Sequence, residues 1–433
     1  GSAASGLPET VFTGYEKMED QGKVLAIIQG GKRVDSAAEG AEVSVVLDKT
    51  PFYGEGGGQV GDSGVLEAEG VSVDVIDTTK HEGVYLHRAV VGEGTLNVGD
   101  SLVAKVDSSR RGAIMRNHTA AHLLQAALRE VLGSHVEQAG QLVNDRHVRF
   151  DFTHFSALTA EELVQVEMLV NQEILKGVPV SMVEMPIEEA RKSGAMALFG
   201  EKYGDVVRVV SVEDGFSKEF CGGTHMDNTA RLGLFKIISE SSVASGVRRI
   251  EGVTGMGVLE VLGAQGTTLR ETAQALKVAN PMELPLHARQ MMAEAKEKDK
   301  QIDLLNSKLA QNRLEGVFQN AQEVAGVKVV YALLSGTSSD ALRALCDKAK
   351  ERPAAIVGVF AGVSDGKATL AAVCTKAAQE KGLKAGVLVK EVAQICGGNG
   401  GGRPDFAMAG AKDQSKLDDA LAAVPELVKK QIG

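Results

Sequence analysis

Two histidines on one predicted helix and a later Cys–His pair could together bind a metal ion. His118 and His122 begin an apolar run that continues to residue 128, so a helix places both imidazoles on one face, with Cβ atoms roughly 5–6 Å apart. Cys221 and His225 flank Gly222-Gly223-Thr224, where the glycine pair favours a tight loop that turns both side chains toward one point. Three imidazoles and a thiolate form a tetrahedral set that favours Zn²⁺ over Mg²⁺ or Ca²⁺.

Each half of this pattern also has a simpler interpretation. A histidine pair at this spacing is often a surface or satisfied core feature of a helix, and a free cysteine is commonly a buried apolar residue. The two halves together favour the metal site.

The chemistry open to such a metal follows from its neighbours. Thr119 stands where the zinc peptidase pattern has a glutamate base, which argues against peptidase activity. Four protein ligands are typical of a closed structural zinc, whereas hydrolysis needs an open or displaceable position. With water bound, the metal could lower the pKa of that water or polarise an ester carbonyl. The Thr119 hydroxyl could discriminate a substrate hydroxyl, or serve only in helix packing.

The metal pattern lies within residues 107–255, which we expect to be mixed α/β. A helix begins near residue 109, and Thr159 with Glu162 forms a capping box for a second helix that reaches about 175. Short strands are expected at 148–152, 178–183, 206–210, 234–239 and 247–253, with a short helix at 187–192. Arg110, Arg111 and Arg116 precede the histidines. They are either a solvated helix face or a basic approach suited to a phosphate-bearing substrate.

The preceding residues, 6–106, read as all-β. Short β-branched runs at 24–28, 41–47, 71–76 and 101–106 are separated by Gly- and Asp-containing turns, which predicts a small barrel or meander. The glycine cluster in 51–62 lacks the lysine of a phosphate-binding P-loop and does not open a helix, so spacing alone favours a structural turn.

The last two regions are a helical segment at 256–325 and an α/β domain at 326–433. A seam between 291 and 312 is interrupted by Lys298 and Asn312, which leaves a helical hairpin and a dimeric coiled coil equally open. In the last domain, strands at 327–333, 354–361 and 367–374 alternate with helices at 339–350, 385–396 and 414–431. Gly400, Gly401, Gly402 and Arg403 form a loop that could contact a sugar–phosphate backbone or be a mobile surface loop. The expected fold class is therefore α+β multidomain.

Composition sets further bounds. The chain has 433 residues and a formal charge of −10, which argues against wholesale electrostatic binding to nucleic acid but allows a local basic groove. Four scattered cysteines fit a reducing cytosol. We find no apolar run of membrane-spanning length and no signal peptide pattern, so we expect a cytoplasmic chain without a membrane partner. Residues 1–5 read as a leader that is not part of the fold.

Several motifs together resemble the editing region of alanyl-tRNA synthetases and their free-standing editing relatives. They are the histidine pair with 221–225, Pro51-Phe52-Tyr53 with 57–62, residues 194–203, residues 246–251, and Gly400 to Asp405. The resemblance runs from about Val11 to the C-terminus and is closest to the second half of the bacterial synthetases. Gly56 departs from it, because many relatives have a serine there.

This resemblance implies an activity and a set of roles. The family's editing domain hydrolyses the ester of tRNA(Ala) mischarged with serine or glycine. His118, His122, Cys221 and His225 would bind Zn²⁺, and Thr119 and Gln138 match positions that distinguish serine from alanine. The C-terminal region with the 400–403 loop would help to bind tRNA and would support a homodimer. Arg110, Arg111 and Arg116, from their position before the histidines, are further candidates for tRNA contacts, and we expect no DNA partner.

The part of the synthetase that uses ATP to join alanine to tRNA has no counterpart that we can find in these residues. Two alternatives remain. One is an RNA-binding and dimerisation module whose zinc is structural, and the other is a free-standing trans-editing protein.

Overall fold

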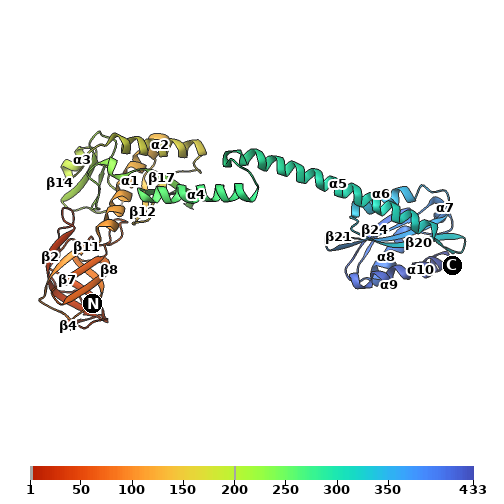
Figure 1. Cartoon of the computed structure of the whole chain (residues 1–433), viewed down its shortest axis with the longest axis horizontal. Helices are drawn as coiled ribbons and strands as arrows, with labels where there is room; N and C mark the ends of the chain where they lie inside the picture. Colours follow the sequence, from red (N-terminus) through yellow and green to blue (C-terminus); the bar gives the residue numbers. More distant parts are fainter. Residues whose placement is uncertain (1–2, 199–200) are drawn as a thin grey trace. The chain divides into compact units, whose positions relative to one another are not determined.

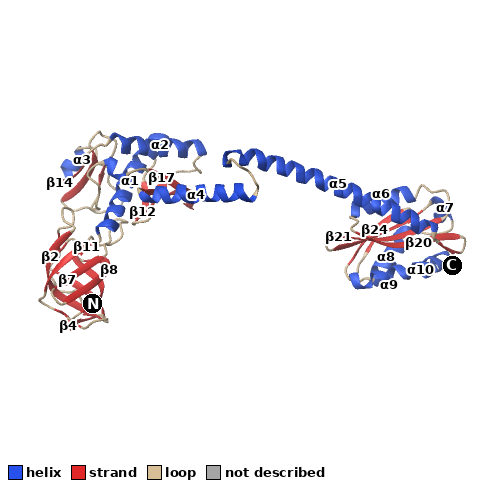
Figure 2. Ribbon diagram, in the orientation of Figure 1, coloured by secondary structure: helices blue, strands red, loops and turns tan. Residues whose placement is uncertain are grey.

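The computed structural model describes residues 3–198 and 201–433. The chain divides into two compact units, Gly1–Glu271 and Thr272–Gly433, and we describe each by itself. Figure 1 follows the chain along its sequence and Figure 2 marks its helices and strands. Among the described residues, no helix is both long enough and apolar enough to cross a membrane.

The first unit begins with a closed barrel of six antiparallel strands. They are β2 (Glu19–Gln29), β5 (Glu42–Leu47), β7 (Gly64–Ala68), β8 (Val71–His81), β9 (Val84–Glu93) and β11 (Ser101–Val106). The order β11-β7-β8-β9-β5-β2 closes because β11 also pairs with β2. Alternate residues point inward, as Val71, Val73 and Val75 do on β8, and fill the interior. The expected small barrel is confirmed.

Short strands complete the barrel. β3 (Lys32–Val34) pairs with β2 in antiparallel orientation. β1 (Val11–Phe12) pairs with β6 (Lys49–Thr50), and β4 (Ser36–Ala37) pairs with β10 (Leu96–Asn97). Residues 1 and 2 of the predicted leader lie outside the described residues. Ala4 is buried against Ala26, Val46 and Val84, so this part of the segment packs on the barrel.

The second part of this unit packs two helices against a four-stranded antiparallel sheet. The sheet has the order β12 (Gln138–Val143), β13 (Val148–Thr153), β18 (Val247–Thr254) and β17 (Phe235–Ala244). Helix α1 (Ser108–Leu132) begins at Asp107, whose carboxylate accepts from the Arg110 backbone N–H. Helix α2 (Ala160–Lys176) begins with the predicted capping box of Thr159 and Glu162. It ends at Gly177, whose backbone adopts the left-handed αL conformation.

A smaller sheet carries the rest of the unit. It has the order β14 (Val180–Pro186), β15 (Val206–Val212) and β16 (Lys218–Phe220), with α3 (Ile187–Lys192) between the first two strands. A 3₁₀ turn, η1 (Thr229–Leu232), precedes β17, and α4 (Met256–Ala275) follows β18. Phe199 and Gly200, from the motif at 194–203, lie outside the described residues.

The second unit begins with helices. A turn, η2 (Pro281–Glu283), leads into α5 (Leu284–Gln319), a single continuous helix of 36 residues that carries the predicted seam. The seam residues Ile302, Leu305 and Leu309 are more than half exposed. A hairpin within this seam is therefore wrong, because one helix spans it. Pairing of α5 with a second chain stays a prediction.

The remaining residues form a six-stranded sheet with helices on both faces (Figure 2). The order is β19 (Gln322–Val324), β20 (Val327–Ser335), β21 (Ile356–Ser364), β22 (Lys367–Cys374), β24 (Phe406–Ala411) and β23 (Gly400–Gly402). Only β20 and β21 pair in parallel, joined by α6 (Ser339–Ala349). Helices α7 (Lys376–Glu380) and α8 (Ala385–Ile395) precede the glycine-rich residues.

Two further expectations for this unit are wrong. Gly400, Gly401 and Gly402 form an edge strand paired with β24 rather than a loop, although glycine has little intrinsic preference for strands. The final helix is divided into η3 (Gln414–Lys416), α9 (Leu417–Ala422) and α10 (Val424–Ile432). Pro425 explains the second break, because it lacks the N–H that would continue α9 and fits only the first turn of α10.

Candidate metal centre

The four predicted ligands converge on one point. His118 and His122 lie one turn apart on the buried face of α1, and Cys221 and His225 lie on the loop between β16 and η1. One ligand atom from each side chain lies within 4.8 Å of the other three. This convergence of residues far apart in the sequence is what the motif spacing predicted.

The spacing of these atoms fits a tetrahedral metal. Zinc bonds of about 2.0–2.3 Å would place neighbouring ligand atoms about 3.3–3.7 Å apart. Cys221 Sγ lies 3.5 Å from His118 Nε2 and 3.3 Å from His225 Nε2. The donor set and its geometry therefore suit zinc.

Each imidazole is oriented by a partner on its other nitrogen. His118 Nδ1 lies 2.7 Å from Gln59 Oε1, and His225 Nδ1 lies 3.1 Å from Thr119 Oγ1. His122 Nδ1 lies 2.5 Å from Glu219 Oε2. Partners of this kind fix the ring orientation and leave Nε2 for a metal.

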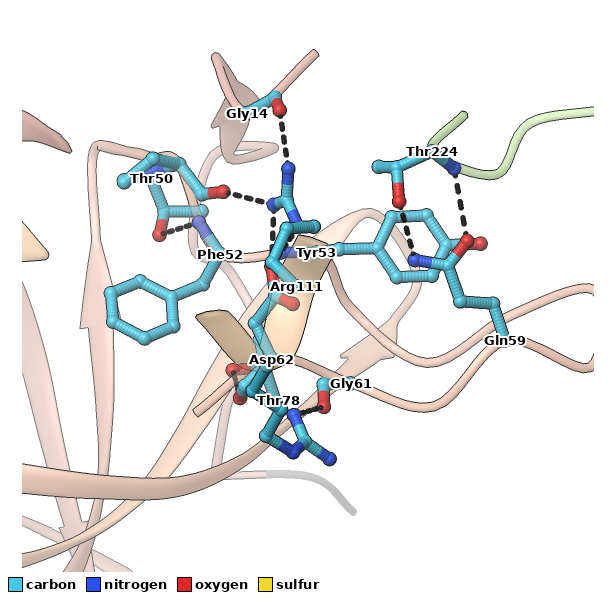
Figure 3. A network of polar contacts seen from close by, with 12 residues as sticks. Gly14, Thr50, Phe52, Tyr53, Gln59, Gly61, Asp62, Thr78, Arg111 and Thr224 are labelled. Carbon is cyan, nitrogen blue, oxygen red and sulfur yellow. Dashed lines mark hydrogen bonds and ion pairs between the residues drawn. The ribbon is translucent and has the colours of Figure 1, made fainter. Parts of the chain in front are cut away.

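The contacts of Gln59 determine which nitrogen of His118 carries a proton. The Thr224 backbone N–H donates to Gln59 Oε1 at 2.9 Å, and Gln59 Nε2 donates to Thr224 Oγ1 at 2.8 Å (Figure 3). Because a backbone N–H can only donate, the amide oxygen must face it. The same oxygen faces His118 Nδ1, which must therefore be the N–H nitrogen. The lone pair of His118 Nε2 is left for the metal.

The pKa values of the other three ligands are shifted by burial and by their neighbours. Burial opposes ionisation of Cys221, but the surrounding imidazoles, led by His118, lower the pKa of this thiol well below its ordinary value. Burial lowers the pKa of His225 to about 3, so its ring is neutral. Burial would also lower the pKa of His122, yet the Glu219 carboxylate and Cys221 raise it to about 10. His122 thus retains Nδ1–H for Glu219, and a metal would replace only the proton on Nε2.

A cavity of about 520 Å³ borders the cluster. His118, His122 and Cys221 line it, together with Gly222 and Gly223 of the loop. Its other walls are rich in aromatic, amide and charged side chains, among them Tyr15, Tyr53, Lys80, Tyr85, Glu137, Gln138, Gln141, Glu201, Lys202, Arg208 and Glu219. A molecule in this cavity could reach the metal position.

The two predicted specificity residues differ in position. Gln138 lines the cavity from β12. Thr119 is buried, and its hydroxyl contacts His225 Nδ1 and accepts from the Met226 backbone N–H at 3.0 Å. Thr119 is therefore placed to orient a metal ligand, and its role toward a substrate hydroxyl stays a prediction.

The three arginines have different environments, and one expectation is wrong. Arg111 is 1% exposed, and its Nε donates to Asp62 at 2.9 Å while its other nitrogens donate to the carbonyls of Gly14 and Pro51 (Figure 3). It joins α1 to the barrel and is not available to tRNA. Arg110 is partly exposed and donates to the Gly61 carbonyl. Arg116 is also partly exposed, and its Nε is buried without a hydrogen-bond partner.

The glycine-rich strand lies in the second unit. It borders a groove of about 560 Å³ that is also lined by Lys384 and Lys390. The side chain of Arg403 is 72% exposed, and its Nε lies 3.4 Å from Asp405 Oδ1. These residues are accessible, and their contact with RNA stays a prediction.

Sequence reasoning missed two of the three residues that orient the imidazoles, and one that fixes the ligand loop. Gln59 lies in the glycine segment that spacing alone assigned to a plain turn, and Glu219 directly precedes Phe220 on β16. Tyr15, whose hydroxyl donates to the Gly222 carbonyl, had no signal in its surrounding sequence. For Gln59 a signal existed, since a lone amide beside glycines can approach another backbone closely.

Comparison with models of known families first defines the class of protein to which this chain is similar. Residues 3–110 match the family model of class II (A) tRNA synthetases, and residues 207–251 match the second additional domain of threonyl and alanyl tRNA synthetases. Residues 326–430 match the DHHA1 domain. The barrel and the metal cluster loop thus each lie within a match, as does the last sheet apart from β19, and the first two matches are to aminoacyl-tRNA synthetases.

The relatives narrow the class to one family. The alanine–tRNA ligase of Acetivibrio thermocellus is 48% identical over 98% of this chain and 48% of its own length. That of Bacillus subtilis is 44% identical over 97% of this chain and 48% of its own length. The chain belongs to the alanine–tRNA ligase family, and it spans about half the length of the curated relatives it matches.

Among solved structures, the C-Ala domain from Aquifex aeolicus alanyl-tRNA synthetase is 25% identical. The match covers 25% of this chain and 97% of that domain, with a TM-score of 0.24. A likeness of this size adds nothing to the sequence matches.

Proposed function

We propose that this chain is an aminoacyl-tRNA deacylase that hydrolyses the ester of tRNA(Ala) mischarged with serine or glycine. The observation that carries the proposal is the contact between the metal cluster and the cavity. His118, His122 and Cys221 line a space of about 520 Å³, so an ester placed there meets the metal position directly. Membership in the alanine–tRNA ligase family supplies the substrate.

A bound Zn²⁺ would polarise the ester carbonyl or lower the pKa of an attacking water. The protein's own residues would bind and orient the substrate. Gly222 and Gly223 let a substrate approach the loop backbone, and the hydroxyl of Tyr15 fixes that loop through the Gly222 carbonyl. Thr119, Gln59 and Glu219 orient the three imidazoles.

Selection of serine over alanine would depend on amide groups in the cavity. Gln138 and Gln141 both line it, although residues three apart on a regular strand face opposite sides. A register shift between Gln138 and Gly140 on β12 removes this conflict. A seryl hydroxyl could then gain a hydrogen bond that the alanyl methyl group cannot make.

The proposal extends to partners and to the parent protein. Arg110, Arg116, the β23 edge strand and Arg403 are our candidates for tRNA contacts, and α5 is our candidate for a homodimer contact. The full-length ligase would also join alanine to tRNA(Ala) with ATP.

A second candidate function is an RNA-binding and dimerisation module with a structural zinc. The observation that favours it is the ligand set itself, because four protein ligands are typical of a closed site. Cys221→Ala separates the two. Lost deacylation with retained fold and tRNA binding supports catalysis, whereas global unfolding supports a structural metal. Cys396→Ala, at a buried cysteine of the other unit, controls for loss of a thiol.

The direct test measures ester hydrolysis by the zinc-loaded chain. We expect release of serine and glycine from mischarged tRNA(Ala), with Ala-tRNA(Ala) left largely intact. Equal hydrolysis of all three, or no hydrolysis by zinc-replete protein, would contradict the proposal.

A further inference from the structure

One wall of the cavity is an aromatic cluster from the barrel that carries a lysine. Phe12 lies at its centre, with ring centroids 4.8 Å from Tyr15, 6.0 Å from Tyr53 and 5.8 Å from Tyr85. Lys80 Nζ lies 5.8 Å from the centroids of both Tyr53 and Tyr85. The two tyrosines therefore hold the ammonium group by cation–π contact at the cavity wall.

Lys80 is held in place along its whole length. A Cβ added at Gly54 would lie 2.5 Å from Lys80 Cγ, so the stem of the side chain lies against the Gly54 backbone. A lysine that is already ordered loses less conformational entropy when it binds a ligand. The Lys80 side chain is therefore ordered before a ligand binds, unlike the side chain of a solvated surface lysine.

The ammonium group also lacks an acidic partner. Among the described residues, no carboxylate lies within ion-pair distance of Lys80, whereas Lys105 on the same barrel pairs with Glu67. Burial lowers the pKa of Lys80, and no neighbouring carboxylate counteracts this shift. Glu137, Glu201 and Glu219 also line the cavity, but among the described residues none of them forms an ion pair with the lysine, and Glu219 contacts His122 instead. A positive charge at a cavity wall without an ion-pair partner favours an anionic ligand.

A short chain of contacts connects Lys80 to the metal cluster. Tyr53, beneath Lys80, donates through its hydroxyl to the Gly56 carbonyl at 2.9 Å. The next carbonyl, that of Gly57, accepts from Gln141 Nε2 at 2.7 Å, and the same nitrogen lies 3.4 Å from His118 Nε2. One loop therefore lies between the lysine and a metal ligand.

We infer that Lys80, held on Tyr53 and Tyr85, binds the phosphodiester of the terminal nucleotide whose ribose carries the ester. The inference rests on the proposed function, because the ester at the metal fixes where that ribose lies. A ribose joins its 5′ phosphate to its 2′ and 3′ hydroxyls, so an ester at the cluster places the phosphate one sugar away. The cluster holds two cations, Lys80 on Tyr53 and Tyr85, and Arg208, whose guanidinium carbon lies 3.4 Å from the Tyr15 ring centroid. We assign the phosphate to Lys80 because the Gly56–Gly57 loop connects its tyrosine to a metal ligand.

The test compares substrates with and without a phosphate. Lys80→Met keeps the apolar stem on the tyrosines and removes the charge, and Lys80→Arg keeps the charge. Lys32→Met, at an exposed lysine on β3 outside the cavity, is the matched control. Each variant is assayed on Ser-tRNA(Ala) and on the seryl ester of adenosine, which has no phosphate.

We expect Lys80→Met to raise KM for Ser-tRNA(Ala) about tenfold or more, with kcat little changed. Hydrolysis of seryl-adenosine stays within about twofold of wild type, because the lost partner is absent from it. The slope of log KM against log salt concentration falls by about 0.7, as expected for one lost phosphate contact on single-stranded RNA. Lys80→Arg recovers most of the loss, and Lys32→Met matches wild type.

Equal losses on both substrates, or no loss on either, would overturn the inference. If wild type hydrolyses neither substrate, the proposed function fails instead, and binding then decides the role of Lys80. Titration with adenosine 5′-monophosphate and with adenosine should show tighter binding of the phosphorylated compound by wild type. Lys80→Met should abolish that difference, and a difference that survives the substitution would contradict the assignment.

Discussion

The side-chain oxygen of Gln59, from the barrel, lies 2.7 Å from Nδ1 of His118 on α1. Gln59 is fully buried, and its two amide atoms also bond both polar groups of Thr224, next to ligand His225. One barrel side chain therefore contacts both halves of the metal cluster. The barrel thus takes part in the site although it supplies no ligand.

Gln59→Ala should weaken metal binding by about 10- to 100-fold, the usual cost of removing a partner that orients a ligand. The truncation frees the His118 ring and leaves the Thr224 N–H without its acceptor. Competition with a zinc chelator measures the affinity. Gln29→Ala, at an exposed position on β2, should bind zinc as wild type does. An unchanged affinity in Gln59→Ala would show that His118 needs no such support.

Substitution by alanine should lower the zinc content at one glycine of the ligand loop and leave it unchanged at the other. A Cβ at Gly223 would lie 2.1 Å from His118 Cε1 and 2.8 Å from Gln59 Oε1, so Gly223→Ala must displace a ligand. A Cβ at Gly222 meets nothing closer than the Tyr15 hydroxyl at 3.9 Å. We expect Gly223→Ala to lose most of its bound zinc in metal analysis and Gly222→Ala to retain it. Equal zinc contents would contradict the close approach.

The ligands were predictable because their signal is local. His118 and His122 share a helix face by spacing alone, and Cys221 with His225 spans one glycine loop, so each pair could be identified before folding brought them together. Glu219 and Gln59 act only across the fold, through contacts with α1 and the ligand loop. The glycines beside Gln59 allow a close backbone approach, but no residue near Gln59 or Glu219 in the sequence specifies which side chain is the partner.

The helical spacing of α1 carries a signal for the burial of Arg111 that the interpretation of the three arginines as a group did not use. Arg111, Ile114, His118 and Ala121 follow the helical spacing of one buried face, so periodicity placed this arginine inward. Its charge suggested solvent instead, because arginine is rarely buried without a partner. The partner, Asp62, lies in the glycine-rich segment of the barrel and could not be assigned from the sequence.

Arg111→Met should destabilise the first unit by about 3–5 kcal/mol, because it leaves the Asp62 carboxylate buried without its cation. Urea unfolding measures the loss. Arg88→Met, at an exposed position on β9, should change stability by no more than about 0.5 kcal/mol. The double variant Arg111→Met with Asp62→Leu should lose less than the sum of the single variants. Additive losses would show that the two side chains do not interact.

His87 should make the barrel less stable in mild acid. Burial lowers the pKa of this histidine from 6.5 to about 4, while Thr50 Oγ1 and the Val45 carbonyl contact its two nitrogens. The unfolded chain therefore binds a proton below pH 6.5 that the folded barrel rejects until about pH 4. Stability falls across that window by about 3 kcal/mol and then levels off.

Hydrogen exchange of the β5 and β9 amides measures this dependence. His87→Gln should remove it, and His81→Gln, at an exposed position on β8, should retain it. An identical pH dependence in His87→Gln and wild type would contradict the assignment.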